Sequence, residues 1–570
     1  MKANLPGQSQ PEPRALREVL PANHFDHRTA EVRLESDRLR HPMRLRLVPL
    51  LLFTLPAWAD TYRRQPEVDV VHYEIALQFT EGSETIAGVT RVHVMMRQAG
   101  VSQMRLDFEN MTVEALKVDG KERPFTHRNG QISVGLGRSY NEHEIAVVEV
   151  RYRGRPDGKG LLIGKNNYNR NVYFAENWPD RAHHWFPSID HPYDKATVEF
   201  SITAPEKYDV VANGRLVETR SLLEGRKLTR WSESVPIPTY CMVIGAAEFS
   251  VTHAAGTGIP LSFYAYPQDA AAAASRFART SSVLEYLIHR IGPYPYEKLA
   301  QVQSTTKIGG MENSSAIFYA EQGFQQPKVS EDPVPHEIAH QWFGDSVTET
   351  DWDHLWISEG FATYFSALFY EYLGGAESMK RIMAGAAEAV QQYHKKHPAA
   401  LIDSGQTDLM KKLNPFNYQK GAWVLHMLRK VLGDEVFFAG IRRYYSLYAG
   451  GNASTEDFQK VMESVSGTLL ATFFRQWFYQ PGWPDYRVSW RWDGAARAAE
   501  LRFHQAQTTG LFDMPLEIAL SAANGREVRT VHVHEQDQVV RIPSDQPPSS
   551  VEIDPDGWVL KSLQVSAEKP

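Results

Sequence analysis

Two histidines with a glutamate between them form the strongest chemical signal in this sequence. His336-Glu337-Ile338-Ala339-His340 has the pattern H-E-x-x-H. Residues four positions apart share one face of a helix, so both imidazoles can reach a single metal ion while Glu337 stands next to it. A metal ion held in this way can activate a water molecule, and Glu337 has the position of a general base that takes the proton from that water. The pattern therefore predicts metal-assisted hydrolysis.

A third metal ligand is needed, and Glu359 is the candidate. It lies in the segment Trp356–Ala362, with 18 residues between it and His340. This gap leaves room for a loop and a second helix that turns back on the first. Two His and one Glu with an open fourth position form the ligand set of a catalytic zinc ion, because structural zinc sites close all four positions and usually use Cys. We predict one Zn²⁺ per chain; the alternative is a salt-bridged pair of helices with incidental histidines.

The local sequence predicts a helix that begins just before His336. Asp332 can cap its start, Pro333 suits the first helical position, and Gly344 can end it. Because this helix carries two of the three predicted ligands, the site depends on how a second helix, with Glu359, is placed against it.

The region before these motifs reads as β-sheet. From Asp69 to about Ser250 apolar residues alternate with polar ones, which is the period of half-buried strands. Turn signals interrupt the pattern, and no convincing long helix is present. We interpret residues 60–255 as an N-terminal all-β domain.

The period changes twice in the rest of the chain. Ala270–Ile291 is rich in Ala with helical spacing, and helical patterns then dominate, so we interpret residues 256–484 as a mainly helical domain that carries the chemistry. In residues 485–570 the alternation returns, and Asn524-Gly525 predicts a β-hairpin, which favours a small C-terminal β-sandwich. The expected fold class is a multidomain α+β protein.

Composition narrows the possible partners and metal ligands. The 570 residues include 61 Lys and Arg against 68 Asp and Glu, a net charge of −7. An acidic balance without a long basic run excludes nucleic acid as a partner. The single cysteine, Cys241, excludes an intramolecular disulfide and a Cys-rich metal site. Any metal must therefore bind through His and carboxylates.

Residues 43–59 have the anatomy of a secretory signal peptide. Arg44 and Arg46 form a basic region, Leu47–Leu55 an apolar region, and Ala57-Trp58-Ala59 an A-x-A cleavage site. The apolar region is too short to cross a bilayer, which takes about 20 residues. The alternative is a buried apolar element or an uncleaved anchor.

Signal peptides begin near the initiator methionine, so we expect translation to start at Met43, with residues 1–42 as an upstream extension. The mature chain would then begin at Asp60. We expect a protein without a membrane span in its mature chain, exported to the periplasm or the extracellular space.

The motifs together resemble those of the M1 zinc aminopeptidases, the gluzincins typified by aminopeptidase N and leukotriene-hydrolase-type enzymes. Four blocks match the family in order and spacing: Gly309-Gly310-Met311-Glu312-Asn313, His336–Gly344, Trp352–Tyr364 and Tyr418-Gln419-Lys420-Gly421. Weaker matches at Phe186-Pro187 with Asp190 and at Gln476–Pro484 extend the resemblance over most of the mature chain. It implies a thermolysin-like catalytic domain, in a short form that lacks the large C-terminal helical domain of many relatives.

The resemblance also implies roles for residues outside the metal triad. Tyr418 would donate a hydrogen bond to the oxyanion, as a phenol that stays protonated near neutral pH. Glu312 would bind the free α-ammonium of a peptide, while its neighbours Gly309, Gly310, Met311 and Asn313 align the chain. The predicted function is a zinc-dependent aminopeptidase that hydrolyses the N-terminal peptide bond, with a zinc-bound water activated by Glu337.

One family position differs in this chain. The family places a Gln or Glu nine residues before the proline of the Phe-Pro motif, where it helps to hold the substrate amine. Counting back from Pro187 reaches Trp178, and Glu176 lies two residues earlier. Either Glu176 serves this role or the pocket differs.

Two functions of other kinds are alternatives: an inactive relative that binds peptides, and a zinc enzyme that hydrolyses epoxides. Every residue that the peptidase mechanism needs is present, which argues against the inactive relative. The motifs do not separate peptide from epoxide hydrolysis. The expected partners are peptides with a free N-terminus.

Overall fold

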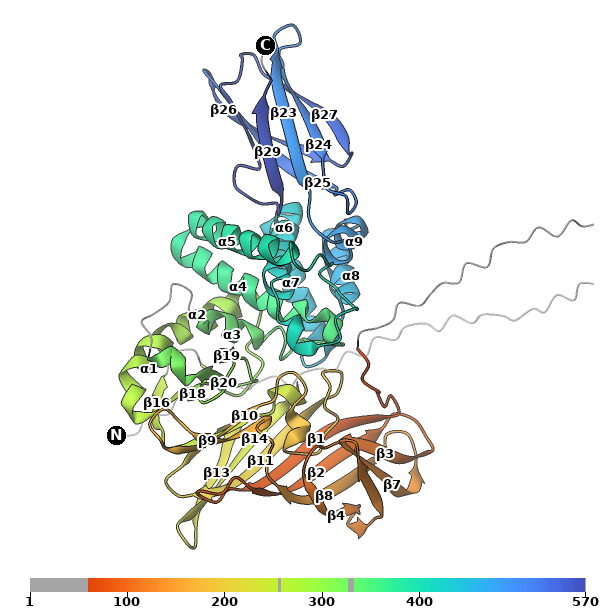
Figure 1. The fold of residues 1–570 in the computed structure, drawn as a ribbon, viewed down its shortest axis with the longest axis vertical. Helices are drawn as coiled ribbons and strands as arrows, with labels where there is room; N and C mark the ends of the chain where they lie inside the picture. The colour runs from red at the N-terminus through yellow and green to blue at the C-terminus, as the bar shows by residue number, and fades with distance from the viewer. Residues whose placement is uncertain (1–59, 255–257, 326–332, 569–570) are drawn as a thin grey trace, which may run out of the picture. The chain divides into compact units, whose positions relative to one another are not determined.

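The computed structural model describes residues 60–254, 258–325 and 333–568. In chain order they form a β-rich region, a largely helical region and a second β-rich region, which confirms the predicted α+β fold class (Figure 1). The predicted extension and signal peptide, residues 1–59, lie outside the described residues. Among the described residues, no helix combines the length and apolarity needed to cross a membrane.

Fifteen strands build the N-terminal β-rich region. They are β1 (Val68–Gln78), β2 (Ile86–Met96), β3 (Val101–Asp107), β4 (Thr112–Val118), β5 (Lys121–Glu122), β6 (Phe125–Arg128), β7 (Gln131–Tyr140), β8 (Ile145–Gly154), β9 (Gly160–Lys165), β10 (Asn171–Glu176), β11 (Lys195–Pro205), β12 (Asp209–Ala212), β13 (Arg215–Leu222), β14 (Arg226–Pro238) and β15 (Ile244–Ala247).

The largest sheet of this region has the strand order β13-β14-β11-β1-β2-β8-β4-β5. Strand β1 shows why the alternating pattern predicted it: Tyr73, Ile75 and Leu77 are buried, while the residues between them are more exposed. Two smaller sheets, β12-β15-β10-β9 and β3-β7-β6, complete the region. Strand β10 ends at Glu176, the residue whose role in holding the substrate amine the sequence does not decide.

The middle region combines a five-stranded sheet with helices. Its sheet has the order β16-β17-β18-β20-β19, and a two-stranded pair, β21-β22, accompanies it. The strands are β16 (Ser250–Ala254), β17 (Leu261–Ala265), β18 (Leu299–Ser304), β19 (Gly310–Met311), β20 (Ala316–Ala320), β21 (Thr348–Glu349) and β22 (Asn452–Ala453). The α-helices are α1 (Ala270–Arg276), α2 (Thr280–Arg290), α3 (Val334–His340), α4 (Trp356–Gly374), α5 (Ala376–His394), α6 (Gly421–Leu432), α7 (Asp434–Tyr448), α8 (Thr455–Ser466) and α9 (Ala471–Phe478).

Two helices differ from the sequence prediction. The Ala-rich segment is divided into α1 and α2 by a 3₁₀ turn, Phe277–Arg279, at which Phe277 packs against Phe263 and Phe324. Helix α3 ends at His340 rather than at Gly344, because the chain turns sharply after it: the N–H of Gly344 donates to Val347 O at 2.8 Å. Asp332, the predicted cap of α3, lies outside the described residues.

The C-terminal region is a sandwich of two sheets, β27-β24-β23-β29 and β26-β25-β28 (blue in Figure 1). Its strands are β23 (Asp485–Asp493), β24 (Ala498–Gln505), β25 (Met514–Ala522), β26 (Gly525–Val533), β27 (Asp537–Pro543), β28 (Ser550–Ile553) and β29 (Ser562–Ala567). Strands β25 and β26 pair antiparallel across the predicted turn, with Ala522 opposite Gly525. The hairpin that Asn524-Gly525 predicts is present.

Asp190 is the centre of a buried polar network in the N-terminal region. His183 Nδ1 lies 2.7 Å from Asp190 Oδ2, and the Thr239 hydroxyl donates to Asp190 Oδ1 at 2.7 Å. Burial alone would lower the pKa of His183, but the hydrogen bond and charge of Asp190 raise it to about 9. His183 is therefore protonated at neutral pH, and the ion pair stabilises the turn that leads into Phe186-Pro187.

We expect His183→Gln to lower the free energy of unfolding by about 3 kcal/mol at neutral pH, because it leaves the Asp190 carboxylate buried without its cation. The folded-state pKa of about 9 lies above the value of about 6.5 for an unfolded histidine. The stabilisation is therefore complete below pH 6.5 and is lost as the pH rises through 9. Urea unfolding at several pH values measures this. The same substitution at the exposed residue His143 is the control. If the difference in unfolding free energy between wild type and His183→Gln does not become smaller at alkaline pH, the ion pair is contradicted.

Candidate metal centre

Helices α3 and α4 bring the three predicted metal ligands together. The Nε2 atoms of His336 and His340, on α3, are 2.9 Å apart. Glu359, in the first turn of α4, places Oε2 3.3 Å from His336 Nε2 and 3.4 Å from His340 Nε2. Donor atoms at about 2.1 Å from a tetrahedral zinc ion lie roughly 3.4 Å from one another. The three side chains therefore have the spacing that one zinc ion requires.

The charges around this triad favour a bound cation. Three buried carboxylates, those of Glu312, Glu337 and Glu359, surround the two imidazoles, and Glu359 Oε2 accepts no well-formed hydrogen bond in the described part of the chain. Against the effect of burial, these carboxylates raise the pKa of His340 to about 10. The cluster thus stabilises a positive charge, which a divalent cation supplies.

The surroundings of His340 select the nitrogen that faces the metal position. Its Nδ1 lies 3.2 Å from the carbonyl oxygen of Phe343 and 3.0 Å from Ser358 Oγ. Because a carbonyl oxygen only accepts, Nδ1 carries a proton, and Nε2 is the nitrogen that would lose its proton to bind a metal. No motif in the sequence predicts this role for Ser358, which directly precedes the predicted ligand Glu359.

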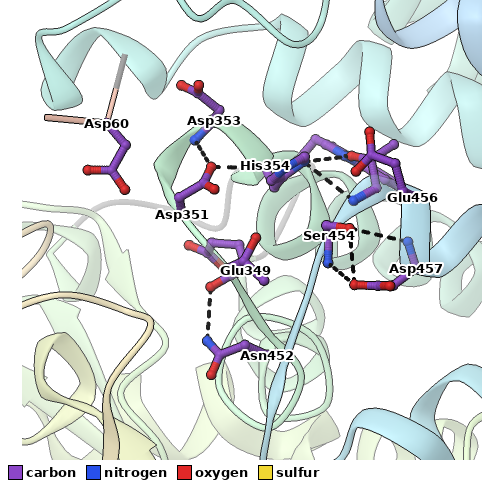
Figure 2. A network of polar contacts seen from close by, with 12 residues as sticks. Asp60, Glu349, Asp351, Asp353, His354, Asn452, Ser454, Glu456 and Asp457 are labelled. Carbon is purple, nitrogen blue, oxygen red and sulfur yellow. Dashed lines mark hydrogen bonds and ion pairs between the residues drawn. The ribbon is translucent and has the colours of Figure 1, made fainter. Parts of the chain in front are cut away.

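Polar contacts hold the segment that connects α3 to α4 (Figure 2). The Asp351 carboxylate accepts from the Asp353 N–H at 3.1 Å, and His354 Nδ1 lies 2.8 Å from Thr455 Oγ1. The Asn452 amide donates to the backbone carbonyl at the end of β21 at 3.0 Å. Thr455 begins α8, whose N-terminus is closed by a capping box of a serine and an aspartate. The segment is thereby fixed to α8, and with it the start of α4.

Tyr418 lies against the metal ligands. It stands in a turn of π-helix, Phe416–Lys420, directly before α6. Its hydroxyl donates to Glu359 Oε1 at 2.7 Å, and its ring stacks on His336 with 5.9 Å between the centroids. Burial, together with the negative charge of Glu359, raises the pKa of Tyr418 well above its ordinary value. The phenol is therefore a hydrogen-bond donor at neutral pH.

Glu337 and Glu312 face the same cavity as the metal triad. A Cβ atom on Gly310 would lie 2.1 Å from Glu337 Oε1, so a larger residue at position 310 would displace this carboxylate from its observed position. Burial, with smaller effects from neighbouring carboxylates, raises the pKa of Glu337 to about 8 and that of Glu312 to about 7. Gln341, which the sequence analysis missed, donates to the backbone oxygen of Glu312 at 2.5 Å. This hydrogen bond ties Glu312, which directly follows β19, to the end of α3.

The cavity has a volume of about 410 Å³. The predicted residues that line it are Gly310, Met311, Glu312, His336, Glu337, His340, Glu359 and Tyr418. Apolar side chains add to its wall, among them Trp178, Ile308 and Leu413. Gly309 and Asn313 were also predicted from the motif, but they do not line this cavity. Asn313 directly follows Glu312 in the chain and is fully buried.

Glu176 does not line the cavity; its carboxylate binds backbone N–H groups of a neighbouring loop. Its Oε1 accepts hydrogen bonds from the backbone N–H groups of Lys307, at 2.5 Å, and Ile308, at 3.1 Å. These two residues directly precede the Gly309-Gly310 segment. Glu176 therefore holds the loop that leads to Glu312, while Trp178 forms part of the cavity wall.

Comparison with protein families finds two matches in this chain. Residues 277–477 match the peptidase family M1 domain, and residues 70–241 match the peptidase M1 N-terminal domain. The first match contains the metal triad, Glu337, Glu312 and Tyr418, and the second contains Glu176. Together the two matches cover more than half of the chain.

Among curated proteins, the probable aminopeptidase 2 of Sulfurisphaera tokodaii is 26% identical over 512 residues, which cover 86% of this chain and 63% of that protein. The glutamyl aminopeptidase of Homo sapiens is 26% identical over 75% of this chain and 48% of its own length. The tricorn protease-interacting factor F2 of Thermoplasma acidophilum is 24% identical over 80% of this chain and 58% of its own length. The chain thus spans about half to two thirds of the length of these relatives.

Proposed function

The chain belongs to peptidase family M1, and we propose that it is a zinc-dependent aminopeptidase that removes the N-terminal residue of peptides. One observation carries the proposal: a metal triad, a buried carboxylate, a protonated phenol and a second carboxylate line one cavity of about 410 Å³. A hydrolase of this class needs a group for each of four tasks, namely metal binding, proton transfer, oxyanion stabilisation and recognition of the chain end.

His336, His340 and Glu359 would hold one Zn²⁺. Their donor atoms are 2.9 to 3.4 Å apart, and neutral imidazole and carboxylate are ligands that zinc prefers. When bound, zinc supplies Lewis acidity that polarises a carbonyl group and makes water a nucleophile near neutral pH.

Glu337 is the proposed general base. It adjoins His336 on α3 and faces the cavity, and its pKa of about 8 is close to neutral pH. A group with such a pKa exchanges protons in both directions. The carboxylate takes a proton from water and then, as the acid, passes it to the leaving amine.

Tyr418 is the proposed donor to the oxyanion. Its O–H is directed at the metal-binding carboxylate of Glu359, so it lies beside the position at which a carbonyl oxygen would be polarised. Because burial keeps the phenol protonated, the donor is preserved throughout the reaction. One such hydrogen bond contributes about 10²- to 10³-fold to kcat.

Glu312 is the proposed anchor for the substrate's α-ammonium. It is only 5% exposed, and an ion pair with an ammonium group would be shielded from water there. An internal amide of a longer chain is neutral and gains nothing from this carboxylate. Glu176 supports the anchor indirectly, since it holds the loop before Gly309-Gly310.

Several relatives are named glutamyl aminopeptidases, but the cavity of this chain does not favour an acidic N-terminal residue. No Lys or Arg lines the cavity among the described residues, so an acidic substrate side chain would find no cation there. Trp178, Ile308 and Leu413 favour a neutral N-terminal residue instead.

The comparisons favour neither alternative function, because the named relatives include aminopeptidases. Hydrolysis of a panel of aminoacyl-nitroanilides tests the proposal against both alternatives. We expect turnover that a chelator abolishes and added Zn²⁺ restores. An epoxide hydrolase or an inactive relative would leave all members of the panel intact.

We expect Glu337→Gln to lower kcat about 10²- to 10⁴-fold while one zinc per chain remains bound, because the side chain transfers protons and is not a ligand. Tyr418→Phe should lower kcat about 10²- to 10³-fold, again with zinc retained. Steady-state kinetics and metal analysis of the same samples measure both effects. Glu388→Gln, at an exposed site on α5, is the control. Turnover near the wild-type rate by Glu337→Gln would refute the general base.

We expect Glu312→Gln to lower kcat/KM for free-amine peptides about 10- to 100-fold, the loss that accompanies removal of a charge-assisted hydrogen bond. The wild type should reject the same peptides when their amine is acetylated, and the variant should discriminate less between the two forms. Kinetics with matched free and acetylated peptides provide the measurement. Unchanged discrimination in the variant would exclude Glu312 as the anchor.

We also propose that the protein is exported, on the basis of the signal-like residues 43–59. Sequencing the N-terminus of the protein recovered from outside the cytoplasm should give Asp60 first. A chain that starts upstream of Met43 would overturn both the proposed start and the proposed cleavage.

A further inference from the structure

A second group of metal-ligand side chains lies in the C-terminal β-sandwich. Asp513, His532 and His534 each offer one ligand atom, and these three atoms lie within 4.8 Å of one another. The closest pair is His532 Nδ1 and Asp513 Oδ1, at 2.9 Å. None of the three lines the catalytic cavity.

The pairing of two strands explains why these residues meet. Strand β26 ends at Val533, which lies opposite Met514 of β25, and His532 lies opposite Pro515. Val533 is fully buried, so its neighbours on both sides, His532 and His534, point to the outer face of the sheet. The same register, continued by one residue, puts Asp513 opposite His534 and on that outer face. The convergence thus follows from a His-x-His sequence at the end of β26 and a carboxylate across from it.

The β26 side of this group is held by one glutamine. Gln538 Oε1 accepts from the backbone N–H of His534 at 2.9 Å and from that of Glu535 at 3.2 Å. Its Nε2 donates to the backbone oxygen of His532 at 2.5 Å. A single side chain therefore fixes the backbone on both sides of Val533.

The Asp513 side is held in the same manner by Gln476 of α9. The Asp513 N–H donates to Gln476 Oε1 at 2.9 Å, and Gln476 Nε2 donates to Asp513 O at 3.0 Å. Gln476 is only 1% exposed, so this pair of hydrogen bonds is protected from water. The carboxylate of Asp513 is thereby positioned relative to the helical region as well as to β26.

We propose that Asp513, His532 and His534 form a second metal site, separate from the catalytic one, for a divalent transition-metal ion of the zinc class. Two imidazoles and one carboxylate suit Zn²⁺ and its neighbours, whereas Ca²⁺ and Mg²⁺ require a shell of oxygen ligands. The three side chains are partly or largely exposed, so an ion can enter from solvent. A bound ion would cross-link the start of β25 to the end of β26 and, through Gln476, stabilise their junction with α9.

An ordinary surface ion pair between His532 and Asp513 is the competing explanation, and the same domain contains a control for it. His504 Nδ1 lies 2.7 Å from Asp537 Oδ1 on the neighbouring sheet, at comparable exposure. That pair is not part of any group of three potential ligands in the described residues. A difference in metal binding between the two pairs therefore reports the contribution of the third ligand.

Zinc stoichiometry of the whole protein tests the proposal. Wild type dialysed against micromolar Zn²⁺ should retain two zinc ions per chain, and the double variant His532→Asn/His534→Asn should retain one. His504→Asn should still retain two. Gln538→Ala, which removes only the backbone clamp, should weaken binding at the second site about tenfold, as the loss of groups that orient ligands does elsewhere.

A second measurement identifies the ligands directly. Cu²⁺ added to the protein with its catalytic site already filled by zinc should give an electron paramagnetic resonance spectrum with two coupled nitrogens, and the double variant should lose it. One zinc per wild-type chain, two in the double variant, or a loss in His504→Asn equal to that in the double variant would each overturn the proposal. These outcomes do not depend on the peptidase activity, so the proposed function can fail or hold independently.

Discussion

A close backbone contact between α4 and the first residue of α6 determines the geometry of the proposed catalytic site. A Cβ atom on Gly360 would lie 2.9 Å from Gly421 Cα, and a Cβ atom on Gly421 would lie 2.9 Å from Gly360 Cα. Gly360 directly follows the ligand Glu359, and Gly421 comes three residues after Tyr418. The two glycines therefore allow the approach that gives the 2.7 Å hydrogen bond between Tyr418 and Glu359. One packing contact thus positions both the third metal ligand and the proposed oxyanion donor.

The N-terminal β-rich region supports this site from the outside. Lys195, at the start of β11, donates through Nζ to the backbone oxygens of Asp345, at 2.9 Å, and Ser346, at 2.8 Å, in the turn after α3. Glu176, at the end of β10, holds the loop before the motif that carries Glu312. Two side chains of the N-terminal region therefore position the helix that carries the proposed metal ligands and the loop that leads to Glu312, the proposed α-ammonium anchor. Because these contacts cross between regions, the helical region alone would leave both segments without support.

Regular local geometry is the part of the structure that could be predicted from the sequence. Alternation identified the β-rich regions, and the spacing of His336 and His340 placed both on one helix face. Contacts between distant segments could not be predicted from the spacing of residues in the sequence. The role of Tyr418 at the site was predicted only from the family resemblance. The carboxylate of Glu176 accepts hydrogen bonds from backbone groups 131 and 132 residues away in the sequence. Phe277 interrupts a helix that its Ala-rich neighbours favour, since its ring packs into an aromatic cluster. In each case tertiary packing outweighs the local pattern.

The two proposed metal sites use the same kinds of ligand, but the surroundings of these ligands differ. In the proposed catalytic site the histidines lie four apart on a helix, beside the buried carboxylates of Glu312, Glu337 and Glu359, and they line a cavity of about 410 Å³. Burial there strengthens charge interactions, and Glu337, the proposed general base, lines the same cavity. In the proposed C-terminal site His532 is the penultimate residue of strand β26 and His534 directly follows that strand, and both side chains are largely exposed to solvent. A metal at that position would stabilise the junction between the sandwich and α9, because Asp513 is also hydrogen-bonded through its backbone to Gln476.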